Sequence, residues 1–201
     1  MAAEVVLQWG HNMTACIPTV KLSGMQIFYR HDSGSTRFRV FSIDRGSIYQ
    51  GDGVLGRPAR WFGGPPQPGA DPQAVLSALT QRARDDGYDT LPQHVLMIQY
   101  ALDSSGSAED LEKRNTVTSL LTNALVSLGY GTVDGEDIGS GKMTVFAFVV
   151  QPAAAASCCV GALREAGLLA GVVLVSAPPD DDGDQVAHWP EGYDVNAFSV
   201  L

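Results

Sequence analysis

The sequence predicts an α+β protein made of two domains. In the first half, short runs of aromatic and β-branched residues are separated by turn-forming residues, which is typical of a small antiparallel sheet. In the second half, strand-length apolar runs alternate with longer stretches in which leucine and valine recur at helical spacing. We therefore expect an N-terminal extension (1–24), a first domain (25–92), a second domain (93–178) and an acidic C-terminal tail (179–201).

The first domain is expected to open with a hairpin. Residues 25–31 (MQIFYRH) and 37–43 (RFRVFSI) have strand character, and the intervening DSGS is a turn sequence. The segment 47–53 (SIYQGDG) is a candidate third strand. The next stretch, 56–72, is so dense in glycine and proline that we expect it to be irregular.

A single helix is expected to close the first domain. Asp71 followed by Pro72 matches an N-cap with proline at the first helical position. Gly87 fits a C-terminal cap. The apolar residues between these caps keep helical spacing: Val75, Leu76, Leu79 and Ala83.

The second domain is predicted to follow the order β-α-β-β-α-β. Its strands are expected at 94–103, around 131–134, at 143–150 and at 171–177. This order is that of the split β-α-β, or ferredoxin-like, unit. The tail is expected to be loop-like, with one small edge strand at 197–201 (AFSVL).

Two helices are expected between these strands. The first starts at a capping-box-like pair, Ser107 and Asp110, and ends at Gly129. The second begins at Pro152 and ends at Gly167. Their apolar faces are formed by Val117, Leu120, Leu121, Ala124, Leu125 and Leu128 in one, and by Ala156, Cys159, Val160 and Leu163 in the other.

Charge is distributed unevenly along the chain. Residues 1–94 hold nine Lys and Arg against eight Asp and Glu, whereas residues 95–201 hold four against fourteen. An acidic half repels nucleic-acid phosphates and suits a basic protein partner. No run of apolar residues approaches the length of a membrane span, and the first residues do not resemble a secretory signal. Three cysteines are too few and too unevenly placed for a disulfide framework. We therefore expect a cytoplasmic protein.

The glycine-rich stretch 129–143 (GYGTVDGEDIGSGKM) imitates several ligand-binding motifs. A phosphate-binding loop would need glycine at Glu136 and a hydroxyl at Met143, and a helix rather than a strand would have to follow. Calcium-loop and dinucleotide spacings also fail. The favoured interpretation is a hairpin connection with glycine turns, and the alternative is a partner-binding surface formed by Asp134, Glu136 and Asp137.

Few residues suggest catalysis. The four histidines lack the spacing of metal ligands. Cys158 or Cys159 could form a nucleophilic pair with His188, but both cysteines lie in the middle of a predicted helix, where nothing lowers the pKa of a thiol. We expect no catalytic residues, no cofactor and no metal. A nucleic-acid or anion-binding site is the candidate role for the arginines of the first domain and one tryptophan: Arg37, Arg39, Arg57, Arg60 and Trp61.

The segment 25–89 resembles a WGR domain, the small module of poly(ADP-ribose) polymerases and assorted bacterial proteins. The likeness lies in the aromatic opening strand, in STRFRVF, in GDGVLGR and in the closing RARDDGYD. The Trp-Gly-Arg triplet would fall at 50–52, where only Gly51 is kept. The resemblance implies a small antiparallel sheet with a helix, and contact with DNA ends.

The region from His94 onward is similar to ferredoxin-like immunity or accessory proteins of bacterial toxin systems. The likeness lies in a leucine-rich helix that ends in LGYGTVDGEDIGSG, in the strand MTVFAFV and in the acidic tail. The resemblance implies a protein that neutralises a basic toxin.

Three functions follow as hypotheses. The first is a non-enzymatic binding protein whose WGR-like and ferredoxin-like domains each contact a macromolecule, most simply another protein, with nucleic acid an option for the first domain. The second is a toxin-neutralising immunity-type protein. The third is a small enzyme that uses the acids at 134–137. A homodimer through sheet edges is also compatible with the second domain.

Overall fold

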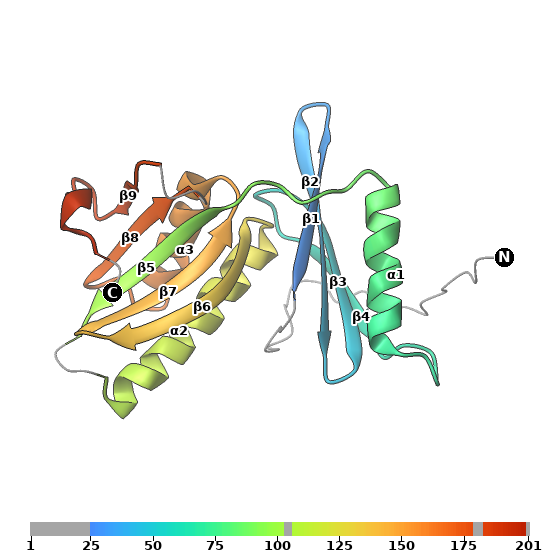
Figure 1. Cartoon of the computed structure of the whole chain (residues 1–201), viewed down its shortest axis with the longest axis horizontal. Coiled ribbons are helices and arrows are strands. Elements are labelled where there is room, and N and C mark those ends of the chain that lie inside the picture. The colour runs from blue at the N-terminus through green and yellow to red at the C-terminus, as the bar shows by residue number, and fades with distance from the viewer. Residues whose placement is uncertain (1–24, 103–105, 179–182, 200–201) are drawn as a thin grey trace. The chain divides into compact units, whose positions relative to one another are not determined.

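The computed structural model describes residues 25–102, 106–178 and 183–199 (Figure 1). The chain divides into two compact units: residues up to 91 together with 127–129, and residues 92–126 together with 130–201. The predicted extension (1–24) lies outside the described residues. Within the described residues, no helix is long and apolar enough to cross a membrane. The protein is of the α+β class, with two separate antiparallel sheets and three α-helices in the described ranges.

The first unit contains a four-stranded antiparallel sheet in the order β1-β2-β3-β4. Its strands are β1 (Gln26–Asp32), β2 (Ser35–Asp44), β3 (Ser47–Val54) and β4 (Arg60–Gly64). The first three match the predicted strands. Strand β4 corrects the prediction that 56–72 is wholly irregular, because Trp61 pairs with Gly51 on β3 and brings a large apolar side chain into the core.

Helix α1 (Pro72–Asp85) covers one face of this sheet. The predicted caps are confirmed, since the Asp71 side chain accepts a hydrogen bond from the Gln73 amide at 3.1 Å and Gly87 adopts φ +83° after the last turn. The side chains between helix and sheet form one apolar cluster: Phe28, Phe41, Leu76, Ala83 and Tyr88.

Two glycines of β3 make room for aromatic rings on the other face of the sheet. A Cβ added to Gly51 would lie 3.1 Å from the Trp61 ring, and one added to Gly53 would lie 2.6 Å from the Phe38 ring. Both rings are buried, at 3% and 1% exposure, so neither can move aside without disturbing the core. Packing thus requires both glycines of the GDG sequence.

The second unit contains a five-stranded sheet in the order β6-β7-β5-β8-β9, with every neighbouring pair antiparallel. The strands are β5 (His94–Ala101), β6 (Gly131–Gly139), β7 (Lys142–Val149), β8 (Val172–Ala177) and β9 (Val186–Trp189). Helices α2 (Ala108–Ser127) and α3 (Pro152–Glu165) pack on the same face of the sheet (Figure 1).

The start of α2 is fixed by the predicted capping box. The Asp110 carboxylate accepts hydrogen bonds from the Ser107 amide and hydroxyl at 2.8 and 2.9 Å, and the Ser107 hydroxyl accepts one from the Asp110 amide at 3.1 Å. These bonds, led by the one from the Ser107 amide, lower the pKa of Asp110. A short sequence signal therefore determined this helix end.

The glycine-rich stretch forms a hairpin connection with a glycine turn, as predicted, but its strand is longer than the expected 131–134. Strand β6 runs from Gly131 to Gly139, eight of its residues pair along β7, and only Ser140 and Gly141 form the turn. The prediction for the tail was wrong. The tail was expected to be loop-like with a strand at 197–201. Instead β9 pairs with β8, residues 195–197 form a 3-10 turn, and Phe198 is buried against the face opposite the helices.

Replacing Gly53 by alanine should destabilise the first unit. The new methyl would overlap the buried Phe38 ring, and we expect a loss of about 1–3 kcal/mol in the free energy of unfolding, measured by urea denaturation followed by circular dichroism. Gly64→Ala is the matched control, because a Cβ there meets nothing within 4 Å, and it should change stability by less than about 0.5 kcal/mol. Equal stability of the two variants would contradict the packing role of Gly53.

Candidate functional site

Two arginines of the predicted anion site, Arg37 and Arg39, lie on the α1-covered side of the first sheet, where aspartates neutralise them. Arg39 on β2 donates to the carboxylate of Asp52 at 2.8 Å and to that of Asp86 at 3.0 Å. Its guanidinium also lies 4.5 Å from the centre of the Tyr88 ring. Burial lowers the pKa of Arg39, but these two hydrogen bonds outweigh burial and raise the pKa overall. Arg39 is therefore held in a structural network.

Two arginines of this face, Arg30 and Arg37, share a single aspartate. Arg30 donates to Asp32 from Nε at 3.1 Å and from Nη2 at 3.3 Å, and Arg37 approaches the same carboxylate at 3.1 Å. Arg30 also lies over Tyr88, at 4.9 Å from the ring centre. Three arginines thus face three aspartates, so this group has little net charge to offer a phosphate backbone.

Of the remaining residues of the predicted anion site, Arg60 lies opposite Asp52 in the pairing of β3 and β4, on the same face as Arg39, whereas Arg57 lies outside the sheet. Arg57 lies in the exposed turn after β3, and Arg60 is the exposed first residue of β4. Among the described residues, neither side chain has a recorded hydrogen bond or ion pair. Trp61 is 3% exposed and packs over Gly51, so the expectation that it stacks on a base is corrected: its ring is already enclosed by the core.

The three acids of the glycine-rich stretch lie along the edge strand β6. Glu136 accepts a hydrogen bond from the Thr118 hydroxyl at 3.1 Å and lies 3.6 Å from the Arg114 guanidinium, both on α2. Asp134 sits where the pairing of β6 and β7 shifts register, and Asp137 lies opposite Thr144. Both aspartates are exposed, and neither has a partner within the part of the chain that the structure describes.

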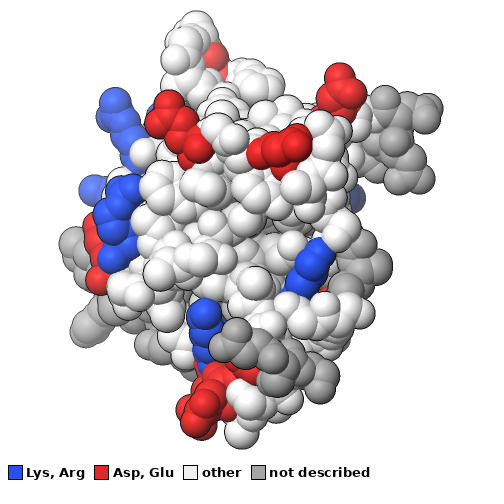
Figure 2. Space-filling model, turned by 90° about the vertical axis from the view of Figure 1, so that its left-hand side faces the viewer, with Lys and Arg blue, Asp and Glu red and all other residues white. Residues whose placement is uncertain are grey.

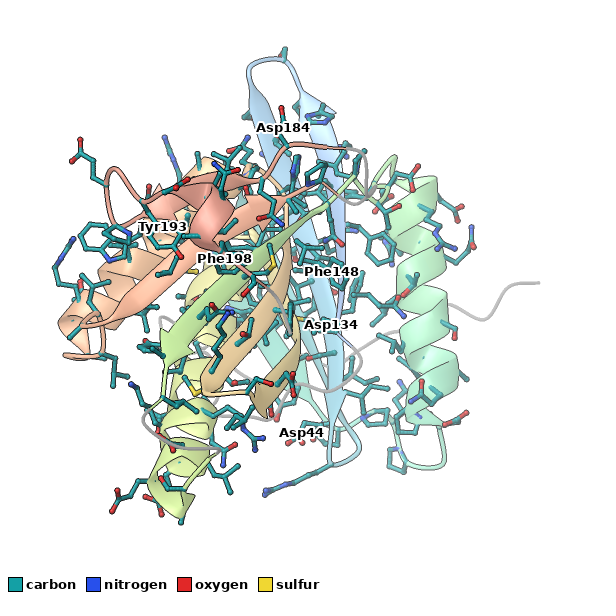
Figure 3. All side chains as sticks on the ribbon, turned by 60° about the vertical axis from the view of Figure 1, so that its left-hand side comes forward. Asp44, Asp134, Phe148, Asp184, Tyr193 and Phe198 are labelled. Carbon is teal, nitrogen blue, oxygen red and sulfur yellow. The ribbon has the colours of Figure 1, made fainter. Side chains whose placement is uncertain are left out.

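A pocket of about 560 Å³ in the second unit was not predicted. It lies where the start of α3 meets the end of β8 and strand β9. The lining residues are His94, Gln151, Pro152, Ala153, Ala154, Ser176, Pro178, Asp184, Val186 and His188. Asp184 belongs to this pocket and lies well apart from Asp134, so the pocket and the β6 acids are separate features (Figure 3).

Ser176 and His188 form the closest polar contact in the pocket. The Ser176 hydroxyl lies 2.8 Å from His188 Nε2, and Ser176 is only 3% exposed. Strand β9 passes His188 at the point where its pairing with β8 shifts by one residue, so His188 is the unpaired residue of that irregularity. Burial lowers the pKa of His188, which favours the neutral imidazole near pH 7.

His188 does not pair with Cys158 or Cys159; its hydrogen-bond partner is Ser176. Cys159 is fully buried in α3, and burial raises the pKa of both thiols, which keeps them protonated. No local sequence signal could have found the Ser176–His188 contact, because it depends on the pairing of β8 with a strand that was not expected.

Comparison with known proteins gave no match to a family model, to a curated protein or to a solved structure. Among the residues that the structure describes, no three histidines, cysteines, aspartates or glutamates are grouped so as to hold a metal ion.

The His188 environment predicts a loss of stability in mild acid. In the unfolded chain His188 has the ordinary histidine pKa of about 6.5, whereas in the folded chain its pKa is lower. Below about pH 6.5 the unfolded chain therefore binds a proton that the folded chain does not, so the free energy of unfolding falls as the pH drops and is unaffected at higher pH. Between about pH 7.5 and about pH 5.5, the urea midpoint should therefore fall more for the wild type than for His188→Asn. An equal fall in both proteins would show that His188 is readily protonated in the fold.

Proposed function

We propose that this chain is a non-enzymatic binding protein whose second unit presents acidic side chains to a basic protein partner. The observation that carries the proposal is the contrast between the two units. Arg30, Arg37 and Arg39 of the first sheet are bound to aspartates, whereas Asp134 and Asp137 on β6 have no side-chain partner among the described residues. An unpaired carboxylate on an edge strand is available to a cation without breaking an internal contact.

The charge balance of the second half supports the same partner class. Residues 95–201 carry fourteen acidic residues against four basic ones. Figure 2 shows charged side chains spaced apart by wide neutral areas on the face in view, so the acid surplus is not gathered there as one patch. The β6 edge, with three acids within four residues, is therefore the place where we locate the contact.

At the level of fold, we propose that the second unit is ferredoxin-like. The order β6-β7-β5-β8 with helices α2 and α3 on one face supports it, and β9 is an added edge strand. We propose likewise that the first unit is WGR-like, on the support of its four-stranded meander and closing helix. Fold by itself does not fix function.

Nucleic-acid binding by the first unit is the second candidate function. It is favoured by the exposed side chains of Arg57 and Arg60. These are the predicted arginines without a recorded partner in the described ranges. Toxin neutralisation is a narrower form of the main proposal, in which the basic partner is a toxin. The geometry supports the enzyme hypothesis less than the two binding functions. Glu136 is hydrogen-bonded to Thr118 on α2, and the pocket beside α3 is lined by none of the β6 acids.

Fluorescence anisotropy with two labelled probes separates these functions. An arginine-rich peptide stands for a basic partner, and a DNA duplex of about 20 base pairs stands for nucleic acid. We expect the full chain to bind the peptide, more weakly as salt rises from about 50 to about 200 mM. The variant Asp134→Asn/Asp137→Asn should weaken peptide binding about threefold or more, because two unpaired charges are removed at constant shape.

Arg57→Gln/Arg60→Gln is the matched control, since it also removes two exposed, unpaired charges but of the opposite sign. It should leave peptide binding unchanged. An affinity for the peptide that is the same in the wild type and in the Asp134→Asn/Asp137→Asn variant would refute the acidic contact. Duplex binding that is lost on changing Arg57 and Arg60 would establish the nucleic-acid function in its place.

A further inference from the structure

We propose that the pocket between α3, β8 and β9 binds a small, largely apolar organic acid, with its carboxylate held by the histidine and serine groups of the pocket. Its volume of about 560 Å³ lies within the range of about 300–1,000 Å³ that is usual for small-molecule sites. The site lies within the second unit and does not involve the β6 acids, so this proposal is independent of the proposed function.

The apolar part of the pocket suits a hydrocarbon body. Prolines, alanines and a valine contribute half of the lining residues: Pro152, Ala153, Ala154, Pro178 and Val186. Val186 is 51% exposed and is one of only two large apolar side chains that are exposed within the described residues. A ligand lying against Val186 would remove this apolar surface from water, which is favourable.

The polar part of the pocket has a hydrogen-bond donor to spare. A neutral imidazole carries one N–H and a serine carries one O–H, so the Ser176–His188 pair holds two such hydrogens and uses one in the 2.8 Å contact. Neither side chain has a second recorded partner among the described residues. The remaining hydrogen needs an acceptor, and a carboxylate oxygen is a strong one.

Other groups of the lining favour an acceptor with negative charge. His94 lines the same pocket, and its side chain has no recorded hydrogen bond in the described part of the chain. The first turn of α3 lacks a side-chain cap, and Ala153 and Ala154 of that turn line the pocket, so the partial positive charge of the helix N-terminus lies at this wall. Asp184 is the one acid of the lining, and its exposed position leaves its charge in water.

The test uses the full chain and a fluorescent probe, 8-anilinonaphthalene-1-sulfonate, which combines an apolar body with an anionic group. The probe should bind, and octanoate should displace it at a concentration about tenfold lower than 1-octanol, which has the same chain length but no carboxylate. In Ser176→Ala and in His188→Asn, this preference for octanoate should fall about fivefold, because the donor pair is broken.

Two matched variants locate the probe. Ala154→Phe fills the pocket and should abolish displaceable binding. Ala170→Phe places the same ring in a second groove of about 530 Å³, lined by Leu169, Trp189 and Tyr193 among others, and should leave binding unchanged. If circular dichroism showed that Ala154→Phe does not fold, Val186→Glu would replace it, since that exposed position tolerates a polar side chain.

Each contrary result overturns the proposal. Absence of probe binding, or binding that Ala170→Phe removes and Ala154→Phe does not, would show that this pocket takes no such ligand. Equal displacement by octanoate and 1-octanol would show an apolar groove without carboxylate recognition. Asp134→Asn/Asp137→Asn should bind the probe like the wild type, which keeps this outcome separate from that of the proposed function.

Discussion

The second unit depends on the burial of its central strand, β5, on both faces. Leu96 and Ile98 pack against helices α2 and α3, and Met97 packs into a separate cluster on the opposite face. Hydrogen-bonded pairing with β7 and β8 leaves β5 no free edge. Because side chains alternate along a strand, this register decides which residues of the neighbouring strands face the helices. Ser176, opposite Leu96, is thereby turned toward the pocket.

Pairing also decides what the charges of the first unit can do. Arg39 lies directly opposite Asp52 in the pairing of β2 and β3, and α1 delivers Asp86 to the same guanidinium. An arginine held by two carboxylates and an aromatic ring stabilises the fold and is not free to bind phosphate. The exposed aspartates of β6 have no such partners in the described ranges, and this difference is the basis of the proposed basic protein partner.

The pocket beside α3 arises from two departures from regular structure. The shift in the pairing of β8 and β9 frees His188 from the ladder, and α3 begins at Gln151 in a left-handed conformation without a side-chain cap. Together they leave polar groups facing an apolar wall, which is the usual composition of a small-molecule site.

The sequence by itself determined the α+β class, most strands and the helix ends. Asp71 with Pro72, and Ser107 with Asp110, encode those ends because a cap needs only residues two or three positions apart. Tertiary structure alone decided the burial of Trp61, the pairing of Arg39 and the contact of Ser176 with His188. Each depends on the register in which two consecutive strands pair, and the side-chain periodicity of one strand does not specify which residue of the next lies beside it.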